Sequence, residues 1–408
     1  MSSGLERIFR ECWWPAVATV TRLAQDLEVA EDAVQEACAA AVVAWGRNGV
    51  PANPRAWLVG AARHKALDWL RREAIRADKE KAALLFDPRP DRSPAEPVTD
   101  DQLALICLCC HPALDAEAQV GLTLRSVCGL RTDEIAAAFL IPESTLAQRV
   151  VRAKRKIREA GIPFGVPAAA VLPQRLSAVL RVLYLVFTEG HRASTTGTLV
   201  RPELCEEAIH LARGLHGLLP AEPEVQGLLA MLLLVDARRP GRLGPEGRLV
   251  LLEDQDRRRW DGQKIAEGAA LVEAALAAGR PGPYQIQAAI AACHSTAASA
   301  AATDWTEITA LYEELLRWEP TPVVKANHAV ALAMADGPAV GLRLLAELSE
   351  DSRLQRWAPF HIAQAGLLER IGRQPEAVAA YRTALALEQP GAEHDFVAER
   401  IQHLGGGR

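Results

Sequence analysis

Acidic side chains in the second half of the sequence have the residue types needed for proton transfer. Glu189 lies two residues before His191. Asp256, Asp261 and Glu267 follow one another in a short span that also holds three adjacent arginines. A carboxylate beside a histidine or a second carboxylate can act as a general acid or base. The adjacent arginines favour a different interpretation, in which these carboxylates cap helices or form salt bridges between helical layers.

Motifs that would support catalysis are missing from the sequence. There is no Gly-rich phosphate loop, no nucleophile elbow and no HExxH metal motif. His294 and His328 lie in Ala-rich helical stretches, where we expect packed or partly exposed helix residues rather than ligands. The sequence therefore predicts a protein that is not an enzyme.

Three cysteines and one histidine stand close together in the segment CLCCHPAL, residues 107–114. Thiolates and imidazoles bind zinc, but a structural zinc site usually takes a second ligand pair from elsewhere in the chain. This segment has no such counterpart, so we expect small buried cysteines and neither a metal nor another cofactor. The eight cysteines of the chain do not follow the spacing of secreted frameworks, so we expect reduced thiols.

Two segments carry an excess of basic side chains suited to contacts with phosphates. Residues 55–81 hold eight basic and four acidic side chains, and residues 143–159 hold six and two. The first segment interleaves its cations with tryptophans, which suits single-stranded nucleic acid because aromatic pockets accept unstacked bases. Taken alone, that segment is more typical of a solvent-exposed basic face over a Trp-rich core.

The elements that must position these side chains are helices. The chain has 408 residues, of which 50% are apolar and 24% charged, so it is long enough for two or three globular domains. Apolar residues recur every three or four positions and nowhere alternate for long, which predicts an all-α fold. No apolar run, residues 228–235 included, approaches the ~20 residues of a membrane span, so we expect no membrane contact and a cytoplasmic protein.

Composition changes mark two linkers. Residues 87–101 combine four prolines with five acidic side chains and cannot form a helix interior. Residues 161–173 contain three prolines and two glycines. Before residue 166 the chain has 22 basic and 22 acidic side chains, and after it 24 and 29, so the acidity belongs to the second part.

Residues 31–45, EDAVQEACAAAVVAW, predict an amphipathic helix with an acidic exposed rim. Its core face would consist of alanines: Ala33, Ala37, Ala40 and Ala41. The next helix opens at Pro54 with PRAWLVGAARHKALDWLRRE and turns basic side chains outward. Its core side would consist of Trp57, Leu58, Ala61, Leu67 and Leu70.

Residues 132–160 predict a helix, a short turn and a second helix. Thr132 is a candidate cap, and the Pro-interrupted LIPES separates IAAAF from the basic TLAQRVVRAKRKIREA. The core between these helices would consist of Ile135, Phe139, Leu146 and Val150. In a helix-turn-helix the start of the second helix enters the major groove, where Gln and Arg read base edges.

In this order, the acidic helix, the basic Trp-bearing helix, the acidic Pro-rich tether and the helix-turn-helix resemble an extracytoplasmic-function sigma factor of bacterial RNA polymerase. The resemblance covers about residues 5–160. It implies two promoter-binding regions, called region 2 and region 4, and two partners, RNA polymerase core and promoter DNA. The site residues that it implies are Asp32, Gln35 and Glu36 for core binding, Trp57, Arg63, His64, Lys65, Asp68, Arg71 and Arg72 for the minus-10 element, and Ser144, Thr145, Gln148, Arg149, Arg152, Lys154 and Arg155 for the minus-35 element.

The second half resembles the C-terminal extension of a sigma-factor subgroup that ends in tetratricopeptide-like helices. Segments such as YLVFTEGH and DQDRRRWDGQKIAEG carry this resemblance. Independently of this resemblance, seven residues have the spacing of a tetratricopeptide helix pair: Leu368, Gly372, Ala377, Tyr381, Ala384, Leu385 and Pro390. A looser copy surrounds Gly337, with Ala333 and Leu342 in corresponding places. Stacked repeats of this kind form concave surfaces that bind proteins or peptides.

The sequence thus predicts five segments: region 2 in residues 1–80, a flexible linker in 81–101, region 4 in 102–162, a helical extension in 163–295 and tetratricopeptide-like repeats in 296–408. The expected function is an alternative sigma factor whose C-terminal domain modulates activity or binds a protein or peptide. An alternative is a helix-turn-helix transcription regulator with a protein- or peptide-binding repeat domain. The segment 31–72 argues against that alternative, which has no need of an acidic core-binding helix before a basic one. A third class, an enzyme fused to a DNA-binding unit, has no supporting motif.

Overall fold

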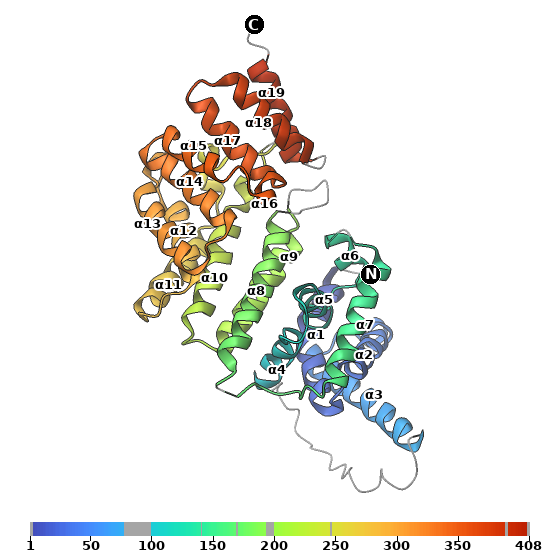
Figure 1. Ribbon diagram of the computed structural model, residues 1–408. Coiled ribbons are helices and arrows are strands. Elements are labelled where there is room, and N and C mark those ends of the chain that lie inside the picture. The colour runs from blue at the N-terminus through green and yellow to red at the C-terminus, as the bar shows by residue number, and fades with distance from the viewer. Residues whose placement is uncertain are drawn as a thin grey trace. The chain divides into compact units, whose positions relative to one another are not determined.

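The computed structural model describes residues 3–76, 99–139, 141–168, 170–192, 200–244, 247–387 and 391–405 (Figure 1). These residues form helices, and the one β-type contact among them is an isolated bridge between Leu243 and Leu249. The prediction of an all-α fold is confirmed. No helix in the described ranges is both long enough and apolar enough to cross a membrane.

The chain forms two compact units, Met1–Leu185 and Val186–Arg408. The division falls inside the long helix α8 (Leu172–His191), later than the sequence boundary expected at residue 162. Residues 172–185 of α8 belong to the first unit, and five of their apolar side chains are buried. These side chains are Leu176, Val179, Leu180, Val182 and Leu183.

The first unit begins with a three-helix bundle of α1 (Ser3–Ala24), α2 (Leu27–Asn48) and α3 (Pro54–Arg76), which pack against one another. Asp26 caps α2 by accepting hydrogen bonds from the backbone nitrogens of Glu28 at 2.8 Å and Val29 at 3.2 Å. Asn53 starts α3 in the same way, because its Oδ1 accepts from the backbone nitrogen of Ala56 at 3.0 Å. Side-chain caps of this kind satisfy the unpaired donors of a helix N-terminus.

The core faces of α2 and α3 differ in part from the prediction. Ala33, Ala37 and Ala41 are buried as expected, but Ala40 is exposed. Residues four apart share one face of a helix, and Ala40 is turned about 60° from Ala37 at the middle of that stripe. On α3 the prediction holds for Leu58, whereas Trp57, Ala61, Leu67 and Leu70 are only half-buried. The rest of the buried face of α3 is made by Val59, Ala62 and Ala66.

The helix-turn-helix predicted over residues 132–160 is present. Four helices make up this part: α4 (Thr99–Cys109), α5 (Ala116–Ser126), α6 (Thr132–Phe139) and α7 (Glu143–Glu159). Ile135, Leu146 and Val150 are buried as predicted. The side chain of Phe139 lies outside the described part, as do residues 77–98 of the predicted linker region. α6 begins at Thr132 itself, so this residue is the first of the helix rather than its cap.

Both parts of the first unit pack together. The indole nitrogen of Trp13 on α1 donates a buried hydrogen bond of 3.0 Å to the carbonyl of Ser126 at the end of α5. Gly129 lies against the same indole with a φ of +68°, and a Cβ there would come within 2.7 Å of Trp13 Cγ. Only glycine combines this backbone conformation with so close an approach. α1 also packs along α4, so the three-helix bundle and the helix-turn-helix part share one core.

The cysteine cluster of residues 107–110 forms part of this core. Cys107, Cys109 and Cys110 are buried, as the sequence predicts, and burial raises the pKa of each thiol. The Cys110 sulfur lies 3.5 Å from the hydroxyl of Thr123. Within the described ranges, no three or more His, Cys, Asp or Glu side chains are grouped as a metal site.

The second unit is a succession of helices, most of which pack on the next along the chain (Figure 1). After the end of α8 they are α9 (Pro202–Leu218), α10 (Pro223–Ala237), α11 (Gly262–Ala277), α12 (Pro283–Thr296), α13 (Trp305–Trp318), α14 (Pro322–Asp336), α15 (Pro338–Glu347), α16 (Ser352–Gln355), α17 (Ala358–Arg370), α18 (Gln374–Leu387) and α19 (Ala392–Gly405). Almost every side of α10 is buried against α9, α11 and α12, because the helix is apolar all round. Between α10 and α11, residues 238–261 form short 3₁₀ turns, η2 (Arg239–Gly241), η4 (Leu252–Asp254) and η5 (Arg257–Arg259).

Paired helices occur where the sequence predicts tetratricopeptide-like repeats. α17 and α18 form one pair, with Ala377, Tyr381 and Ala384 buried between them and Gly372 in the turn at a φ of +76°. α14 and α15 form a second pair joined at Gly337. Pro390, the last residue of the predicted spacing, lies outside the described residues.

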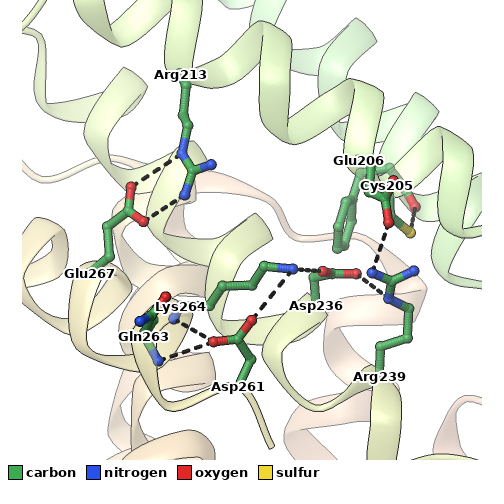
Figure 2. A network of polar contacts seen from close by, with 10 residues as sticks. Cys205, Glu206, Arg213, Asp236, Arg239, Asp261, Gln263, Lys264 and Glu267 are labelled. Atoms are coloured by element: carbon green, nitrogen blue, oxygen red, sulfur yellow. Dashed lines mark hydrogen bonds and ion pairs between the residues drawn. The ribbon is translucent and has the colours of Figure 1, made fainter. Parts of the chain in front are cut away.

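Asp256, Asp261 and Glu267, which were considered for acid–base chemistry, hold helices and turns together, and Figure 2 shows the last two. Asp261 caps α11 by accepting from two backbone nitrogens at 3.0 and 3.1 Å. Glu267 on α11 forms an ion pair of 2.6 Å with Arg213 on α9. Asp256 caps η5 and pairs with Arg258 at 3.0 Å. The interpretation as capping and salt-bridging carboxylates is confirmed.

One buried carboxylate is the centre of the network in Figure 2. The side chain of Asp236, at the end of α10, has no exposed surface. Its Oδ2 lies 2.6 Å from Lys264 Nζ on α11, and its Oδ1 lies 3.0 Å from Arg239 Nε. Arg239 also reaches Glu206 on α9 at 3.2 Å. The network therefore ties α9, α10 and α11 together.

Candidate nucleic-acid interface

The helix α7 presents a polar stripe to solvent. Ser144, Gln148, Arg152 and Arg155 are all exposed, and their spacing of three to four residues places them along one side of the helix. Leu146, Val150, Ala153 and Ile157 form the buried side. The exposed stripe carries both side chains that read bases in a bidentate manner and cations that meet phosphates.

Three other predicted residues of α7 lie beside this stripe rather than on it. Thr145 is half-buried. Arg149 forms an ion pair of 2.8 Å with Glu117 on α5. Lys154 points to the other side of the helix, where its side chain is only 14% exposed and its Nζ lies 2.8 Å from Glu31 Oε2 on α2. Lys154 is therefore not available to DNA in this arrangement of the first unit.

Polar side chains of α3 form a second exposed surface. His64, Lys65, Asp68 and Arg71 are exposed, and Arg63 is half-buried. The side chain of Arg72 lies outside the described part. Trp57 packs edge-on against Trp45, with ring centroids 5.5 Å apart, so it belongs more to the core than to the surface.

Trp69 is the exposed aromatic residue of this surface, and the sequence analysis did not select it. Its side chain is 45% exposed and lies beside Lys65 in a shallow cavity of about 400 Å³. The sequence contained a signal for the exposure of Trp69, because Asp68 and Arg71 flank this residue on the polar side of α3. An exposed indole next to cations can stack on an unpaired base.

The predicted acidic rim of α2 faces the same cavity. Asp32, Gln35 and Glu36 are exposed, and Glu36 forms an ion pair of 3.0 Å with Lys65 on α3. Partial burial raises the pKa of Asp32, and neighbouring glutamates add to this effect. α2 and α3 thus bring the predicted acidic and basic residues into contact.

A second set of acidic residues on α2 binds the helix α7. Glu31 is 2% exposed. It accepts a hydrogen bond from the Ser126 hydroxyl and forms an ion pair with Lys154. Arg158, one turn beyond Lys154, reaches Asp26 at 3.1 Å and Glu28 at 2.6 Å. Sequence reasoning missed this contact because its partners are more than 100 residues apart, although the spacing of Lys154 and Arg158 placed them on one side of α7.

Comparison with known proteins assigns the helices of the first unit. The sequence pattern of sigma-70 region 2 matches residues 15–75, and that of sigma-70 region 4 matches residues 106–157. The chain belongs to the sigma-70 family. In this sigma factor, region 2 lies in α1–α3 and region 4 in α4–α7, and their order is that of the extracytoplasmic-function layout.

The C-terminal part of the sigma factor has relatives as well. Residues 175–276 match a family of unknown function, DUF6596. A protein of Rhizobium meliloti (strain 1021) described as uncharacterized protein R00370 is 42% identical over 395 residues, which is 95% of this chain and 93% of the relative. The sigma regions and the C-terminal unit therefore occur together in that relative along nearly its whole length.

Membership of the sigma-70 family settles the broad class of function. Proteins of this family are transcription initiation factors that bind RNA polymerase core and promoter DNA, and they are not enzymes. The prediction of a sigma factor is confirmed at this level. The helix-turn-helix regulator considered as an alternative has no counterpart to the region 2 match over residues 15–75.

Proposed function

We propose that this sigma factor binds RNA polymerase core through the acidic rim of α2, formed by Asp32, Gln35 and Glu36. These side chains are exposed on one side of region 2. Burial of the opposite, alanine-lined side holds the rim in a fixed orientation. A row of fixed carboxylates and an amide suits a basic protein surface, because charge complementarity steers association and fixes its register.

The exposed side of α3 is the proposed minus-10 surface. Arg63, His64, Lys65, Asp68 and Arg71 would contact the melted strand, and Trp69 adds an aromatic surface for an unpaired base. Trp57 and Arg72 were also predicted here. Trp57 would act mainly through its packing on Trp45.

The single observation that most supports promoter recognition is the exposed stripe of α7 in region 4. Ser144, Gln148, Arg152 and Arg155 would enter the major groove of the minus-35 element. Thr145 and Arg149 border this stripe, and Arg149 would have to leave Glu117 to reach a base. Lys154 would contribute only after it separates from Glu31.

The C-terminal unit is proposed to modulate initiation and to bind a protein or peptide partner. It is the acidic part of the chain, with 29 acidic and 24 basic side chains after residue 165. A groove of about 1030 Å³ lies among α12, α13, α14, α17, α18 and α19. Apolar side chains such as Trp305, Met334 and Phe396 line it, and grooves of this kind accept extended or helical peptides.

Run-off transcription with purified core polymerase on a library of promoter fragments tests the whole proposal. We expect promoter-specific transcripts with the full chain and a changed yield with a chain that ends at Leu185, the last residue of the first unit. Replacing Glu36 by Ala should lower affinity for core, while the same change at the exposed Glu203 of α9 serves as control. Absence of any transcript together with absence of core binding would contradict the proposal.

A further inference from the structure

Three arginines gather in the second unit around the start of the irregular segment 238–261. Arg238 follows α10, Arg242 follows η2, and Arg257 lies in η5. Burial, Arg242 and Arg257 together lower the pKa of Arg238 to about 10. Burial also lowers the pKa of Arg242 and of Arg257. Like charges this close together in a poorly solvated site destabilise the folded state unless a counter-charge is present.

Carboxylates near this cluster are already neutralised by other cations. Arg238 and Arg242 have no ion pair within 4 Å in the ranges that the structure describes. Glu393 attracts Arg242, but Arg192 holds both of its oxygens at 2.9 and 3.1 Å. Three other carboxylates of this unit are paired with other cations: Asp236 with Lys264 and Arg239, Glu253 with Arg370, and Glu369 with Arg400.

The N–H groups of these three arginines have few hydrogen-bond acceptors. Arg242 donates to the backbone carbonyl of His191, and Arg257 donates to the carbonyls of His294 at 2.8 Å and Ala297 at 2.6 Å. Arg238 Nε and His191 Nδ1 are buried and have no hydrogen-bond partner in the part of the unit that is described. Burial and the nearby arginines keep the pKa of His191 well below its usual range, so its ring is neutral. Unpartnered buried donors are uncommon in native proteins.

A small cavity lies at these donors. Its volume is about 260 Å³, and its polar side is made by His191, Arg238, Arg242 and Gln255. The amide of Gln255 is already bonded to the Val250 carbonyl and to the Trp260 indole. The other side of the cavity is aliphatic and includes residues 249–252. A space of this size is close to the lower limit of about 300 Å³ for small-molecule sites.

We propose that this cavity binds a small organic anion, with a carboxylate or phosphate group at Arg238 and Arg242 and a short apolar body against the aliphatic side. This ligand site goes beyond the proposed binding of core polymerase, promoter and a peptide. The bound anion would supply the missing counter-charge and the missing acceptor at once. Charge-assisted hydrogen bonds from arginine to such oxygens are among the strongest in proteins.

The adjacent peptide groove does not offer the same chemistry. Leu251 and Leu252 line both the small cavity and the groove of about 1030 Å³. In the groove, Arg370 and Arg400 are paired with Glu253 and Glu369, and Arg257 donates to the carbonyls of His294 and Ala297. Arg238, whose buried Nε has no acceptor among the described residues, lines the small cavity, and the groove has the larger apolar area. A ligand in the cavity would contact the shared wall of Leu251 and Leu252, through which it could affect the groove.

Titration calorimetry and thermal unfolding of the full chain test the proposal with three probes: pentanoate, inorganic phosphate and the uncharged pentanamide. We expect pentanoate to bind and to raise the Tm by a few degrees, because a ligand that binds only the folded state stabilises it. Phosphate should bind more weakly, since it lacks the apolar body. Pentanamide should have no effect. Equal binding of pentanamide and pentanoate, or no response to either anion, would overturn the proposal.

Substitution of Arg238 by Met distinguishes a ligand-binding role of this residue from a purely structural role. Removing one like charge should raise the Tm of the ligand-free protein and weaken pentanoate binding by about tenfold or more. The matched control is Arg258→Met, since the Arg258 side chain is 90% exposed on the same segment and should change neither quantity. If Arg238→Met fails to fold, Arg242→Lys is the second variant to measure. It keeps the charge and should retain part of the pentanoate binding. A lower Tm for Arg238→Met with unchanged pentanoate affinity would refute the assignment.

Discussion

The buried ion pair between Glu31 and Lys154 joins region 2 to region 4, and its strength can be predicted. Glu31 is 2% exposed and Lys154 is 14% exposed, with 2.8 Å between the charged atoms. At an effective dielectric constant of about 20, Coulomb attraction at that distance is about 6 kcal/mol. The partial exposure of Lys154 and the residual solvation of the site weaken this attraction. We therefore expect a coupling free energy of about 2–3 kcal/mol.

A double-mutant cycle measures this coupling. Glu31→Gln keeps the shape of the side chain and the acceptor for the Ser126 hydroxyl, and Lys154→Met keeps the aliphatic stem. Glu31→Gln alone should destabilise the first unit by about 3–5 kcal/mol because it leaves a poorly solvated ammonium without its partner. The double variant should cost about 2–3 kcal/mol less than the sum of the two single variants.

Hydrogen exchange across a urea series is the assay, because peptides from α5 and α7 report the first unit separately from the second. The control cycle uses Arg149 and Glu117, whose carboxylate is 69% exposed, and should give a coupling of less than about 1 kcal/mol. If the Glu31–Lys154 coupling is no larger than that of this exposed pair, the argument from burial fails.

The remaining predictions concern packing, charge and DNA contacts. Gly129→Ala should destabilise the first unit by about 2 kcal/mol or more, since a positive φ and overpacking against Trp13 each cost about 1 kcal/mol or more, and urea unfolding measures it. Asp236→Ala should destabilise the second unit by about 3–5 kcal/mol by removing the buried partner of both Lys264 and Arg239, and an unchanged unfolding midpoint would contradict the role of this carboxylate. Arg152→Ala should weaken binding to a minus-35 duplex by about 1–3 kcal/mol if it reads a base, and an equal loss on every sequence would make it a phosphate contact.

Local sequence patterns predicted the elements of the first unit well. The apolar spacing of Ile135, Leu146 and Val150 located the helix-turn-helix, and the polar spacing of Ser144, Gln148 and Arg152 located its exposed side. Both features depend on residues within a few turns of each other, where helix geometry alone determines which side chains share a face.

Contacts between distant segments could not be predicted in this way. Glu31 belongs by pattern to an acidic helix and Lys154 to a basic one, and nothing in either pattern says that they meet. The position of Ala40 was wrong because an alanine-rich helix offers several nearly equivalent apolar stripes, and tertiary packing selects one. The cationic cavity was also missed, since Arg238, Arg242 and Arg257 are separated in sequence by acidic and apolar residues that conceal their proximity.

The buried thiols of the first unit give this sigma factor a built-in chemical probe. Cys109 has no exposed surface, Cys128 is 1% exposed, and Cys109 interacts with the same Ser126 that binds Glu31. Because alkylating reagents attack exposed thiolates, both residues should resist labelling while α2 and α7 remain in contact. Separation of region 2 from region 4 on binding to polymerase would then appear as the onset of alkylation at these two positions, read by mass spectrometry without any engineered label.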